Sequence, residues 1–471
     1  MFGVDSGSAK EGNFVEVDFI YGSSHIVSKY PFEHNTGYLL RIENATFSPI
    51  SGTPTFTSTM TISTLSSTPA GTYTITITGT GGGLTRTCTY TLVVTRTWLF
   101  MVYMVGDCDL EGAAIGDINE MEKVGSTDRV KIVVQLDRID GSDTSNDNWT
   151  DTRRYYITQD TDTQNINSQL VQDLDEINMG DPNSLVYFAT WALNNYPANT
   201  NVLVLWGHGK GVWGVCQDFS SVSDILTMAE LKQAMNSIRA SLGRNLDIIG
   251  FDACLMQMVE VGYQIQGTAD IIVGSEETTH GDGWPYDDIL SYLTSHYQMS
   301  PDSFASVIVD NYIKSYDGGS QGYYSSATLS AFWINSIKNN IAPAVSVFAQ
   351  RLIDSIAGWR QQINDARSNT EFYDAVQYPV DSPFRDFSGF GNEIKNRILN
   401  SDVQSAAQTV MNAITSPSGR IAEGHISHQN SHGLSIYFPP NASFQNYKSF
   451  YESLDFAIDT KWNDFLNAYL V

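Results

Sequence analysis

From about residue 97, the chain alternates uninterrupted apolar runs with stretches in which apolar residues recur at helical spacing. The runs are WLFMVYMVG, VKIVVQLD, NVLVLWGHG, LDIIGFDAC and ADIIVGSEE, and the stretches between them include LEGAAIGDINEMEKV, SLVYFATWALNNY and TMAELKQAMNSIRASL. Strands that are apolar on both faces and alternate with helices form a parallel sheet that is covered on both sides. For residues 96–471 we therefore predict an α/β domain with a mostly parallel sheet flanked by helices.

Beyond about residue 300, the sequence pattern is mainly helical. One late strand, SHGLSIYFPP, interrupts it and ends at two prolines, which cannot donate to a strand ladder. We therefore expect a mostly helical C-terminal part.

Residues 1–95 have a different pattern, rich in Thr, Ser and Gly. Segments such as TSTMTISTL, GTYTITITGT and TRTCTYTLVV alternate polar and apolar residues, with glycine- or proline-containing breaks between them. NFVEVDFIYG and TGYLLRIEN add earlier strands. Short strands with this alternation form an antiparallel sandwich. The region resembles the immunoglobulin-like modules of prokaryotic surface proteins, so we predict an all-β N-terminal domain that contributes no chemistry.

Charge and motif content exclude several classes of function. The net charge is −26, with 52 acidic and 26 basic residues, which argues against binding nucleic acid through its phosphates. No strand end carries a glycine-rich nucleotide-binding motif. No apolar stretch approaches the roughly 18 residues needed to span a membrane, and no signal peptide is visible at the start of the sequence. The four cysteines are widely spaced, so they indicate neither a zinc site nor a disulfide framework.

Chemically active side chains follow three of the apolar runs. His208 follows one run, Asp252 and Cys254 end the next, and Glu276 and Glu277 end the third. In open α/β sheets, ligands bind beyond the carboxyl ends of the strands. Taken by itself, Cys254 would be interpreted as a buried packing residue, and His208 as a turn residue. Together at one sheet edge, they predict a reactive site.

A thiol and an imidazole at one edge can perform acyl transfer. Histidine can carry the proton that a cysteine nucleophile and a leaving amine exchange near neutral pH. His208 lies between glycines in WGHGKG, and the glycines allow close approach of a substrate. The backbone N–H groups of Gly209 and Cys254 are our candidates for oxyanion donors.

Five ordered stretches also resemble the clostripain family of cysteine endopeptidases, whose fold is similar to that of the caspases. They are WLFMVYMVGDCDLEGAAIGDINEME, VLVLWGHGKGVWG, LDIIGFDACLMQMVEVGYQI, GSEETTHGDGWPYDDIL and SHGLSIYFPP. The resemblance covers about residues 97–471 and excludes the N-terminal region.

The resemblance implies a role for each matching position. Cys254 would be the nucleophile and His208 the general acid/base. Asp252, Thr279 and Asp282 would line the pocket for the substrate residue before the scissile bond, which in this family is arginine or lysine. Two carboxylates at a sheet edge fit that preference, because a cation offsets the cost of bringing them together. The resemblance further implies protein or peptide substrates and a secreted or cell-surface protein.

Family members are often zymogens that cut themselves at a basic residue between histidine and cysteine. Arg244 lies in the short connection SLGRNLD and is the better candidate, whereas Lys232 falls on a predicted helix. The chemistry requires no cofactor. Some relatives need calcium, and the acidic loop DGSDTSNDNWTD (140–151) has suitable ligand types but lacks EF-hand spacing. We expect a solvated loop there, with calcium binding as the alternative; which residues would ligate a metal stays open.

Two other functions remain compatible with the sequence. A surface or adhesion protein could keep the fold as an inactive scaffold, although an intact histidine and cysteine argue against it. A transpeptidase could use the same residues, because an amine can capture an acyl-enzyme as water does.

Overall fold

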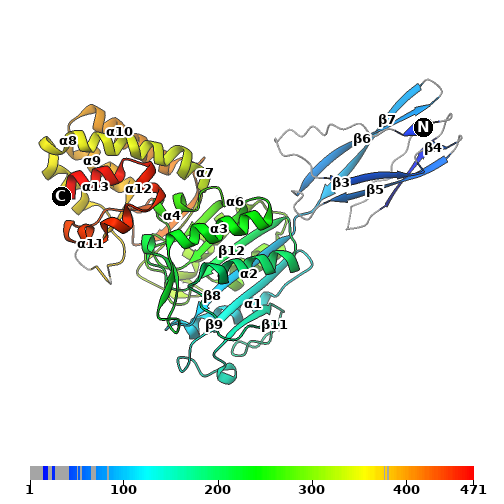
Figure 1. Ribbon diagram of the computed structural model, residues 1–471, viewed down its shortest axis with the longest axis horizontal. Coiled ribbons are helices and arrows are strands. Elements are labelled where there is room, and N and C mark those ends of the chain that lie inside the picture. Colours follow the sequence, from blue (N-terminus) through cyan, green and yellow to red (C-terminus); the bar gives the residue numbers. More distant parts are fainter. Residues whose placement is uncertain are drawn as a thin grey trace. The chain divides into compact units, whose positions relative to one another are not determined.

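The computed structural model describes residues 14–19, 24–26, 42–49, 51–52, 56–64, 70–81, 84–375, 377–378 and 381–470. The chain divides into two compact units (Figure 1). One consists of Met1–Trp98 with Pro197–Thr200, and the other of Leu99–Tyr196 with Asn201–Val471. Within the described residues, no helix combines the length and apolar character that crossing a membrane requires.

The N-terminal unit is all β in its described parts. Its strands form two sheets, in the order β1-β5-β3 and β4-β2-β6-β7. The strands are β1 (Phe14–Phe19), β2 (Ser24–Ile26), β3 (Ile42–Ser48), β4 (Ser51–Gly52), β5 (Phe56–Thr64), β6 (Gly71–Gly81) and β7 (Leu84–Val94). Among the described residues, all five strand pairings within these sheets are antiparallel. The immunoglobulin-like assignment stays a prediction, and residues 36–41 of one predicted strand lie outside the described residues.

In the longest hairpin of this unit, the alternation of polar and apolar residues determines which side chains are buried. In β6, Tyr73, Ile75 and Ile77 are buried while Thr72, Thr74 and Thr76 are exposed. Successive side chains of a strand point to opposite faces, so this alternation makes one apolar and one polar face.

A nine-stranded sheet organises the larger unit, in the order β11-β10-β9-β8-β12-β15-β16-β19-β21. Its strands are β8 (Trp98–Gly106), β9 (Val130–Arg138), β10 (Thr152–Tyr156), β11 (Gln169–Asp173), β12 (Thr200–Trp206), β15 (Leu246–Asp252), β16 (Ala269–Gly274), β19 (Ala327–Trp333) and β21 (Arg420–Ile426). Each of the five apolar runs in the sequence forms one of the strands β8, β9, β12, β15 and β16.

The sheet is mixed, which corrects the prediction of a mostly parallel sheet. Strands β12, β15 and β16 are parallel, whereas β9-β10-β11 and β16-β19-β21 pair antiparallel. The physical reason lies in burial: β11 and β21 are half-buried or exposed along their length, so they carry no continuous apolar run. The antiparallel edge strands therefore leave a weaker sequence signal than the covered central strands.

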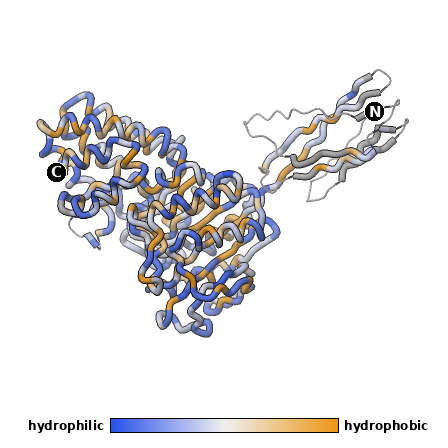
Figure 2. Tube along the Cα trace, in the orientation of Figure 1, coloured by the Kyte–Doolittle hydropathy of each residue, from blue (hydrophilic) through white to orange (hydrophobic). Residues whose placement is uncertain are grey.

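Helices cover the sheet, as the sequence predicts. Helices α1 (Glu111–Val124), α5 (Tyr286–Ser295) and α6 (Pro301–Tyr316) form one contacting series, and α2 (Pro182–Asn195), α3 (Met228–Leu242) and α4 (Val259–Gln264) form another. All residues of β8 and β12 are buried. Hydrophobic residues, orange in Figure 2, accordingly gather along the strands and the inward sides of the helices.

The C-terminal part is mostly helical, with α7 (Ile334–Ser336), α8 (Ala342–Asn369), α9 (Phe387–Arg397), α10 (Ser401–Thr415), α11 (Asn441–Tyr451), α12 (Asp455–Asp459) and α13 (Trp462–Leu470). The predicted late strand is β22 (Ser435–Tyr437), which ends before the two prolines and pairs antiparallel with β20 (Phe384–Asp386). Strands β19 and β21 were not predicted in this region.

Candidate active site

The register of two central strands brings the predicted histidine and cysteine together. Parallel strands β12 and β15 pair residue by residue up to Trp206 and Asp252. His208 and Cys254 each lie two residues beyond this last pair, at the same edge of the sheet. A Cβ atom on Gly209 would lie 2.3 Å from the Cys254 carbonyl oxygen and 2.9 Å from its nitrogen. The two backbones approach so closely that only glycine fits at position 209.

A pocket of about 410 Å³ opens at this edge. It is lined by His208, Gly209, Lys210, Trp213, Cys254, Leu255, Thr278, Asp374, Gln377, Tyr378, Phe384 and Tyr447. Three of the predicted residues, His208, Gly209 and Cys254, therefore share one cavity with an aromatic wall. Three of the wall residues, Tyr378, Phe384 and Tyr447, come from the C-terminal part and had no signal in the sequence analysis, whereas Trp213 follows β12 closely.

The Cys254 side chain is held in a protonated state. Burial raises the pKa of the thiol to about 11; the Thr279 N–H lowers it, and the carboxylates of Asp374 and Glu277 raise it further. The sulfur accepts a hydrogen bond from the Thr279 N–H at 3.3 Å and lies 3.8 Å from the Thr279 carbonyl oxygen. At neutral pH the thiol therefore needs a base before it can act as a nucleophile.

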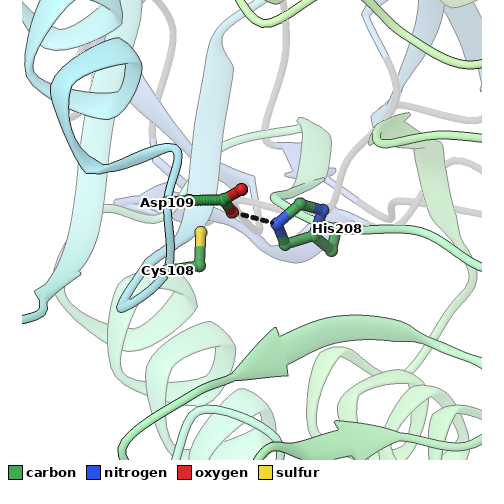
Figure 3. A group of neighbouring side chains, drawn as sticks. All are labelled: Cys108, Asp109 and His208. Carbon is green, nitrogen blue, oxygen red and sulfur yellow. Dashed lines mark hydrogen bonds and ion pairs between the residues drawn. The ribbon is translucent and has the colours of Figure 1, made fainter.

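His208 is held from two sides. Its Nε2 lies 2.6 Å from Asp109 Oδ1, and its ring stacks on Phe219 with an interplanar angle of 3°. Figure 3 shows the Asp109 carboxylate directed at the imidazole, with Cys108 beside the pair. Between the described side chains of His208 and Cys254, the structure contains no hydrogen bond. The imidazole is thus oriented by an aspartate while it shares the pocket with the thiol.

Sequence reasoning missed Asp109 and Phe219. Asp109 lies in GDCDLE, directly after the first apolar run, so a carboxylate at a strand end was a usable signal. Phe219 had none, because ring stacking depends on tertiary structure.

The three predicted specificity residues, Asp252, Thr279 and Asp282, do not line the 410 Å³ pocket. Asp252 is buried; its Oδ2 accepts hydrogen bonds from the Trp284 N–H at 2.9 Å and the Tyr286 hydroxyl at 3.0 Å. Asp252 Oδ1 and Thr279 Oγ1 are both buried without a hydrogen-bond partner. Two buried polar atoms, one on Asp252 and one on Thr279, thus remain unsatisfied.

Asp282 is exposed, and its Oδ2 accepts a hydrogen bond from the Tyr324 hydroxyl at 2.9 Å. The next residue, Gly283, has a φ of +58°, and a Cβ atom there would lie 2.9 Å from both Asp117 Oδ2 and Asp252 Oδ2. The loop that carries Asp282 is therefore packed directly against two buried carboxyl groups.

Asp117, on helix α1, is the second of these carboxyl groups, and the sequence analysis missed it. Its Oδ2 accepts a hydrogen bond from Trp206 Nε1 at 2.6 Å. Burial and the neighbouring Asp252 and Glu120 carboxylates raise the pKa of Asp117 well above its usual range. Burial raises the pKa of Asp252 to about 7. We call Asp117, Asp252, Thr279 and Asp282 the Asp252 cluster.

The remaining predicted residues lie outside this constellation. Arg244 is in the connection between α3 and β15, where its Nη1 lies 2.9 Å from Asp247 Oδ2. Lys232 is on α3 and pairs with Asp455 at 2.5 Å. Glu276 is buried and accepts hydrogen bonds from Tyr373 and Ser431.

Two carboxylates of the acidic loop at residues 140–151 have partners in or beside the loop. Asp143 accepts a hydrogen bond from the Ser145 N–H at 2.7 Å, and Asp151 pairs with Arg153 at 2.8 Å. Among the described residues, two groups of side chains are close enough to hold a metal ion. They are Cys108, Asp109 and His208, and Asp107, Asp137, Glu176 and Asp218; neither includes a residue of this loop. The sequence analysis named neither group. We call the second group the Asp137 cluster.

Known proteins match the larger unit. Clostripain from Hathewaya histolytica is 30% identical over 223 residues, which are 41% of this chain and 41% of that protein. The alignment thus spans less than half of the curated relative's length.

Solved structures share the fold. A secreted C11 cysteine protease from Bacteroides thetaiotaomicron, in complex with an irreversible peptide inhibitor, has a TM-score of 0.57 at 20% identity and covers 79% of this chain and 99% of its own. An inactive zymogen C11 protease from Parabacteroides distasonis has a TM-score of 0.58 at 18% identity, with coverages of 78% and 99%.

The family model of the clostripain family, peptidase family C11, matches residues 102–469, which include both strand ends of the site. The chain therefore belongs to the clostripain family.

Proposed function

We propose that the protein is a secreted cysteine endopeptidase that cleaves peptide bonds after arginine or lysine, with Cys254 as nucleophile and His208 as general acid/base. The observation that carries the proposal is the shared register of β12 and β15, which brings both side chains to one pocket. Family membership supports peptide or protein substrates.

The reaction begins with proton transfer from Cys254 to His208. Because the pKa of the thiol is about 11, this transfer is unfavourable in the resting arrangement. The thiolate then attacks the scissile carbonyl carbon, and the negative charge on the carbonyl oxygen is stabilised by the N–H groups of Gly209 and Cys254. The tetrahedral intermediate collapses to a thioester as the leaving amine takes the proton from His208. Water, deprotonated by His208, hydrolyses the thioester.

Asp109 orients the imidazole during these transfers. Its carboxylate lies 2.6 Å from Nε2, which leaves Nδ1 as the nitrogen that exchanges a proton with the sulfur. The Asp109 carboxylate also stabilises the imidazolium that forms. The arrangement follows the logic of a catalytic triad, in which an acid fixes the tautomer and orientation of the histidine.

The calcium that some relatives need would be held in this chain by the Asp137 cluster. Its oxygen donors are of the type that Ca²⁺ takes, and Asp137 Oδ2 is buried without a hydrogen-bond partner. Burial and neighbouring carboxylates raise the pKa of Asp137 well above its usual range, so a cation would offset the cost of burying it. Asp107 is two residues before Asp109, which pairs with the imidazole. Asp218 directly precedes Phe219, which stacks on the ring, so the ion would fix both segments that hold it.

The Asp252 cluster selects the substrate residue before the scissile bond. A guanidinium that enters beside Cys254 can donate to Asp252 Oδ1 and Thr279 Oγ1, the two buried atoms without partners. The cation also stabilises the charged forms of Asp252 and Asp117, whose pKa values are raised by burial. Arginine is preferred over lysine because its planar fork reaches two acceptors.

Self-processing, where it occurs, cuts after Arg244. Arg244 lies in a connection between a helix and a strand, whereas a cut at Lys232 requires unwinding of α3. Arg244→Gln should leave the protein as one chain on a denaturing gel. Lys232→Gln is the matched control, because it removes the other candidate. Processing of the Arg244 variant at an unchanged rate would contradict this site.

A peptide set that varies only in the residue before the scissile bond tests the specificity. We expect products after arginine, fewer after lysine and few after neutral residues, as read by mass spectrometry. The Cys254→Ala protein serves as the blank. A preference for aspartate or large apolar residues would overturn the pocket assignment, and cleavage by the blank would overturn the nucleophile.

A further inference from the structure

A buried thiol lies beside the imidazole that the proposed mechanism uses. Cys108 and Asp109 follow β8, and His208 follows β12, the neighbouring strand of the sheet. Cys108 Sγ, one Asp109 carboxylate oxygen and one ring nitrogen of His208 each lie within 4.8 Å of the other two. Figure 3 shows the three side chains gathered at the end of these strands. We call these three residues the Cys108 group.

The Cys108 group is buried on one side and open on the other. Cys108 is 0% exposed, whereas the side chains of His208 and Asp109 are 28% and 71% exposed. An ion that arrives from solvent therefore meets the carboxylate and the imidazole first, with the sulfur on the buried side. The proposed peptide cleavage uses His208 and Asp109 but gives Cys108 no role.

The Cys108 side chain is a protonated thiol in the metal-free protein. Burial raises the pKa of the thiol to about 12. Its Sγ lies 3.4 Å from the Val105 carbonyl oxygen, and a thiol is only a weak hydrogen-bond donor. A buried thiol of this kind is a poor nucleophile, whereas a bound metal ion deprotonates a coordinating thiol outright. Metal coordination is therefore the chemistry open to this side chain.

We propose that the Cys108 group binds Zn²⁺ and that the bound ion inhibits the peptidase by occupying His208. Zn²⁺ takes cysteine sulfur, histidine nitrogen and carboxylate oxygen as ligands, and three protein ligands leave one tetrahedral position for water. Ca²⁺ and Mg²⁺ take oxygen ligands, so a sulfur and a nitrogen suit them poorly. The donor types of the Cys108 group therefore select zinc over the hard cations.

The inhibition follows from the position of the proton on the imidazole. In the metal-free protein, Nε2 of His208 lies 2.6 Å from Asp109 Oδ1, and Nδ1 is the nitrogen that would accept the proton of Cys254. When Zn²⁺ bonds to Nε2, the ring proton moves to Nδ1, and the Cys108 thiol releases its proton to solvent. Nδ1–H is a hydrogen-bond donor, so it cannot take the proton of Cys254. The inhibition rests on the proposed function, whereas zinc binding does not.

A second zinc site would use the same histidine. Cys254 and His208 line one pocket, so an ion could bond to that sulfur and to the imidazole. The two sites need different sulfur atoms, Cys108 in one and Cys254 in the other. Single substitutions of the two cysteines therefore separate them.

The binding test uses Co²⁺ as a spectroscopic substitute for zinc in the full-length protein. A thiolate bonded to Co²⁺ gives an intense charge-transfer band in the near ultraviolet, and added Zn²⁺ should remove the band. We expect the band in the parent protein and in Cys254→Ala, and its loss in Cys108→Ser. Cys88→Ser is the matched control and should keep the band. Excess Ca²⁺ in every sample competes for sites made only of carboxylates.

Titrations with Zn²⁺ measure the affinity and the inhibition. Against a chelating indicator, Cys108→Ser should bind Zn²⁺ at least about ten- to a hundredfold more weakly, since even the outer partners of metal ligands account for losses of that size. Asp109→Asn should also bind more weakly but keep the Co²⁺ band, because it retains the sulfur. Zn²⁺ should inhibit cleavage of an arginyl peptide by the parent protein, and a chelator should restore it. Cys108→Ser should cleave at the parent rate without zinc and require at least about tenfold more Zn²⁺ for half inhibition.

Three results would overturn the proposal. One is the absence of a Co²⁺ band in the parent protein. Another is a band that persists in Cys108→Ser and disappears in Cys254→Ala, which would place the ion between Cys254 and His208. The third is zinc that binds through Cys108 and leaves kcat/KM unchanged, which would overturn the inhibition. A parent protein that binds Co²⁺ through Cys108 but cleaves no peptide would contradict the proposed function and support the zinc site.

Discussion

The Asp252 cluster and the Asp137 cluster are alike in composition and differ in what can reach them. Each contains buried carboxylates and leaves a buried acidic oxygen without a partner, Asp252 Oδ1 in one and Asp137 Oδ2 in the other. Asp252 is two residues from Cys254, the residue that we propose attacks the substrate. Asp137 is surrounded by other carboxylates and is connected to the histidine through Asp107 and Asp218.

Under the proposed roles, one kind of imbalance, a buried carboxylate without a partner, serves two purposes. A buried carboxylate without a partner gives specificity for cationic substrate side chains, because only a cationic side chain offsets the cost of burying the carboxylate. A carboxylate group that keeps a resident cation gives a fixed scaffold. In this protein the transient partner would act beside Cys254 and the resident one beside His208.

The largest expected effect comes from substitution of the two proposed catalytic residues. Cys254→Ala and His208→Ala should each lower kcat for an arginyl peptide by about 10⁴-fold or more, because nucleophile and base act as a unit. Ca²⁺ binding to Cys254→Ala should be unchanged. The measurement is initial rate, with thermal unfolding to show that the variants are folded.

Cys88→Ser is the control for these variants. Cys88 lies in the N-terminal unit and is partly exposed, so its loss should leave turnover unchanged. Substantial activity in the Cys254→Ala protein would contradict the assignment of the nucleophile and, with it, the proposed role of the Asp252 cluster.

The second prediction separates the clusters by substrate. Asp252→Asn should reduce kcat/KM for arginyl peptides by roughly 10- to 10⁴-fold, because one or two charge-assisted contacts of about 1.5–3 kcal/mol each are lost. Peptides with a neutral residue before the scissile bond should lose far less. Asp282→Asn should show the same selectivity with a smaller loss, since Asp282 is exposed.

A uniform loss for all peptides would contradict this separation. It would mean that Asp252 supports the position of Cys254 and does not recognise the substrate. Asp137→Asn, assayed in saturating Ca²⁺, is the matched comparison and should affect all peptides equally.

The sequence predicted the strands that are covered on both faces and the residues at their ends. Continuous apolar runs identified β8, β9, β12, β15 and β16, because full burial requires apolar side chains on both faces. Strands β10, β11, β19 and β21 escaped prediction. The edge strands β11 and β21 are half-buried or exposed, so they carry no continuous apolar run. The inner strands β10 and β19 are mostly buried, but arginines interrupt the apolar pattern of β10, and Thr328 and Ser330 interrupt that of β19.

The residues of the site likewise fall into those that the sequence predicted and those that it did not. His208 and Cys254 were predictable because each follows an apolar run directly. Asp117 was not, because its partner Trp206 belongs to a strand far away in the chain, and only the folded structure puts the two side chains 2.6 Å apart. The Asp137 cluster draws its members from four separate strand ends, a juxtaposition that no local spacing reveals.

The third prediction uses pH to compare the clusters without any activity. Burial raises the pKa of Asp252 from 3.8 to about 7 and that of Asp137 well above 3.8. Between about pH 4 and pH 7 the folded protein therefore binds more protons than the unfolded chain. The free energy of unfolding of the cation-free protein should fall as pH rises through this window.

The contribution of each cluster to this pH dependence can be measured separately. Asp252→Asn should flatten the fall in stability in the absence of any ligand. Added Ca²⁺ should flatten the part that belongs to the Asp137 cluster, because a bound cation lowers the pKa of its ligands. Urea unfolding at pH 5, 6 and 7, with and without Ca²⁺, measures both. A free energy of unfolding that rises with pH in the cation-free protein would contradict the assigned direction of these pKa shifts.

The smallest expected effect concerns the N-terminal unit, whose described residues contribute neither to the two clusters nor to the pocket. A protein without residues 1–94 should retain kcat/KM for a short arginyl peptide and the same Ca²⁺ affinity. The truncation keeps the segment from Thr95 to Thr97, because Asn199 hydrogen-bonds to both of these residues just before β12, the strand that leads to His208. The measurements are peptide hydrolysis and the luminescence of Tb³⁺ bound in place of Ca²⁺, with circular dichroism as the folding control. A truncated protein that folds and binds Tb³⁺ but does not cleave the peptide would show that the N-terminal unit contributes to the substrate site, and the peptide-binding region would then have to extend beyond the two clusters.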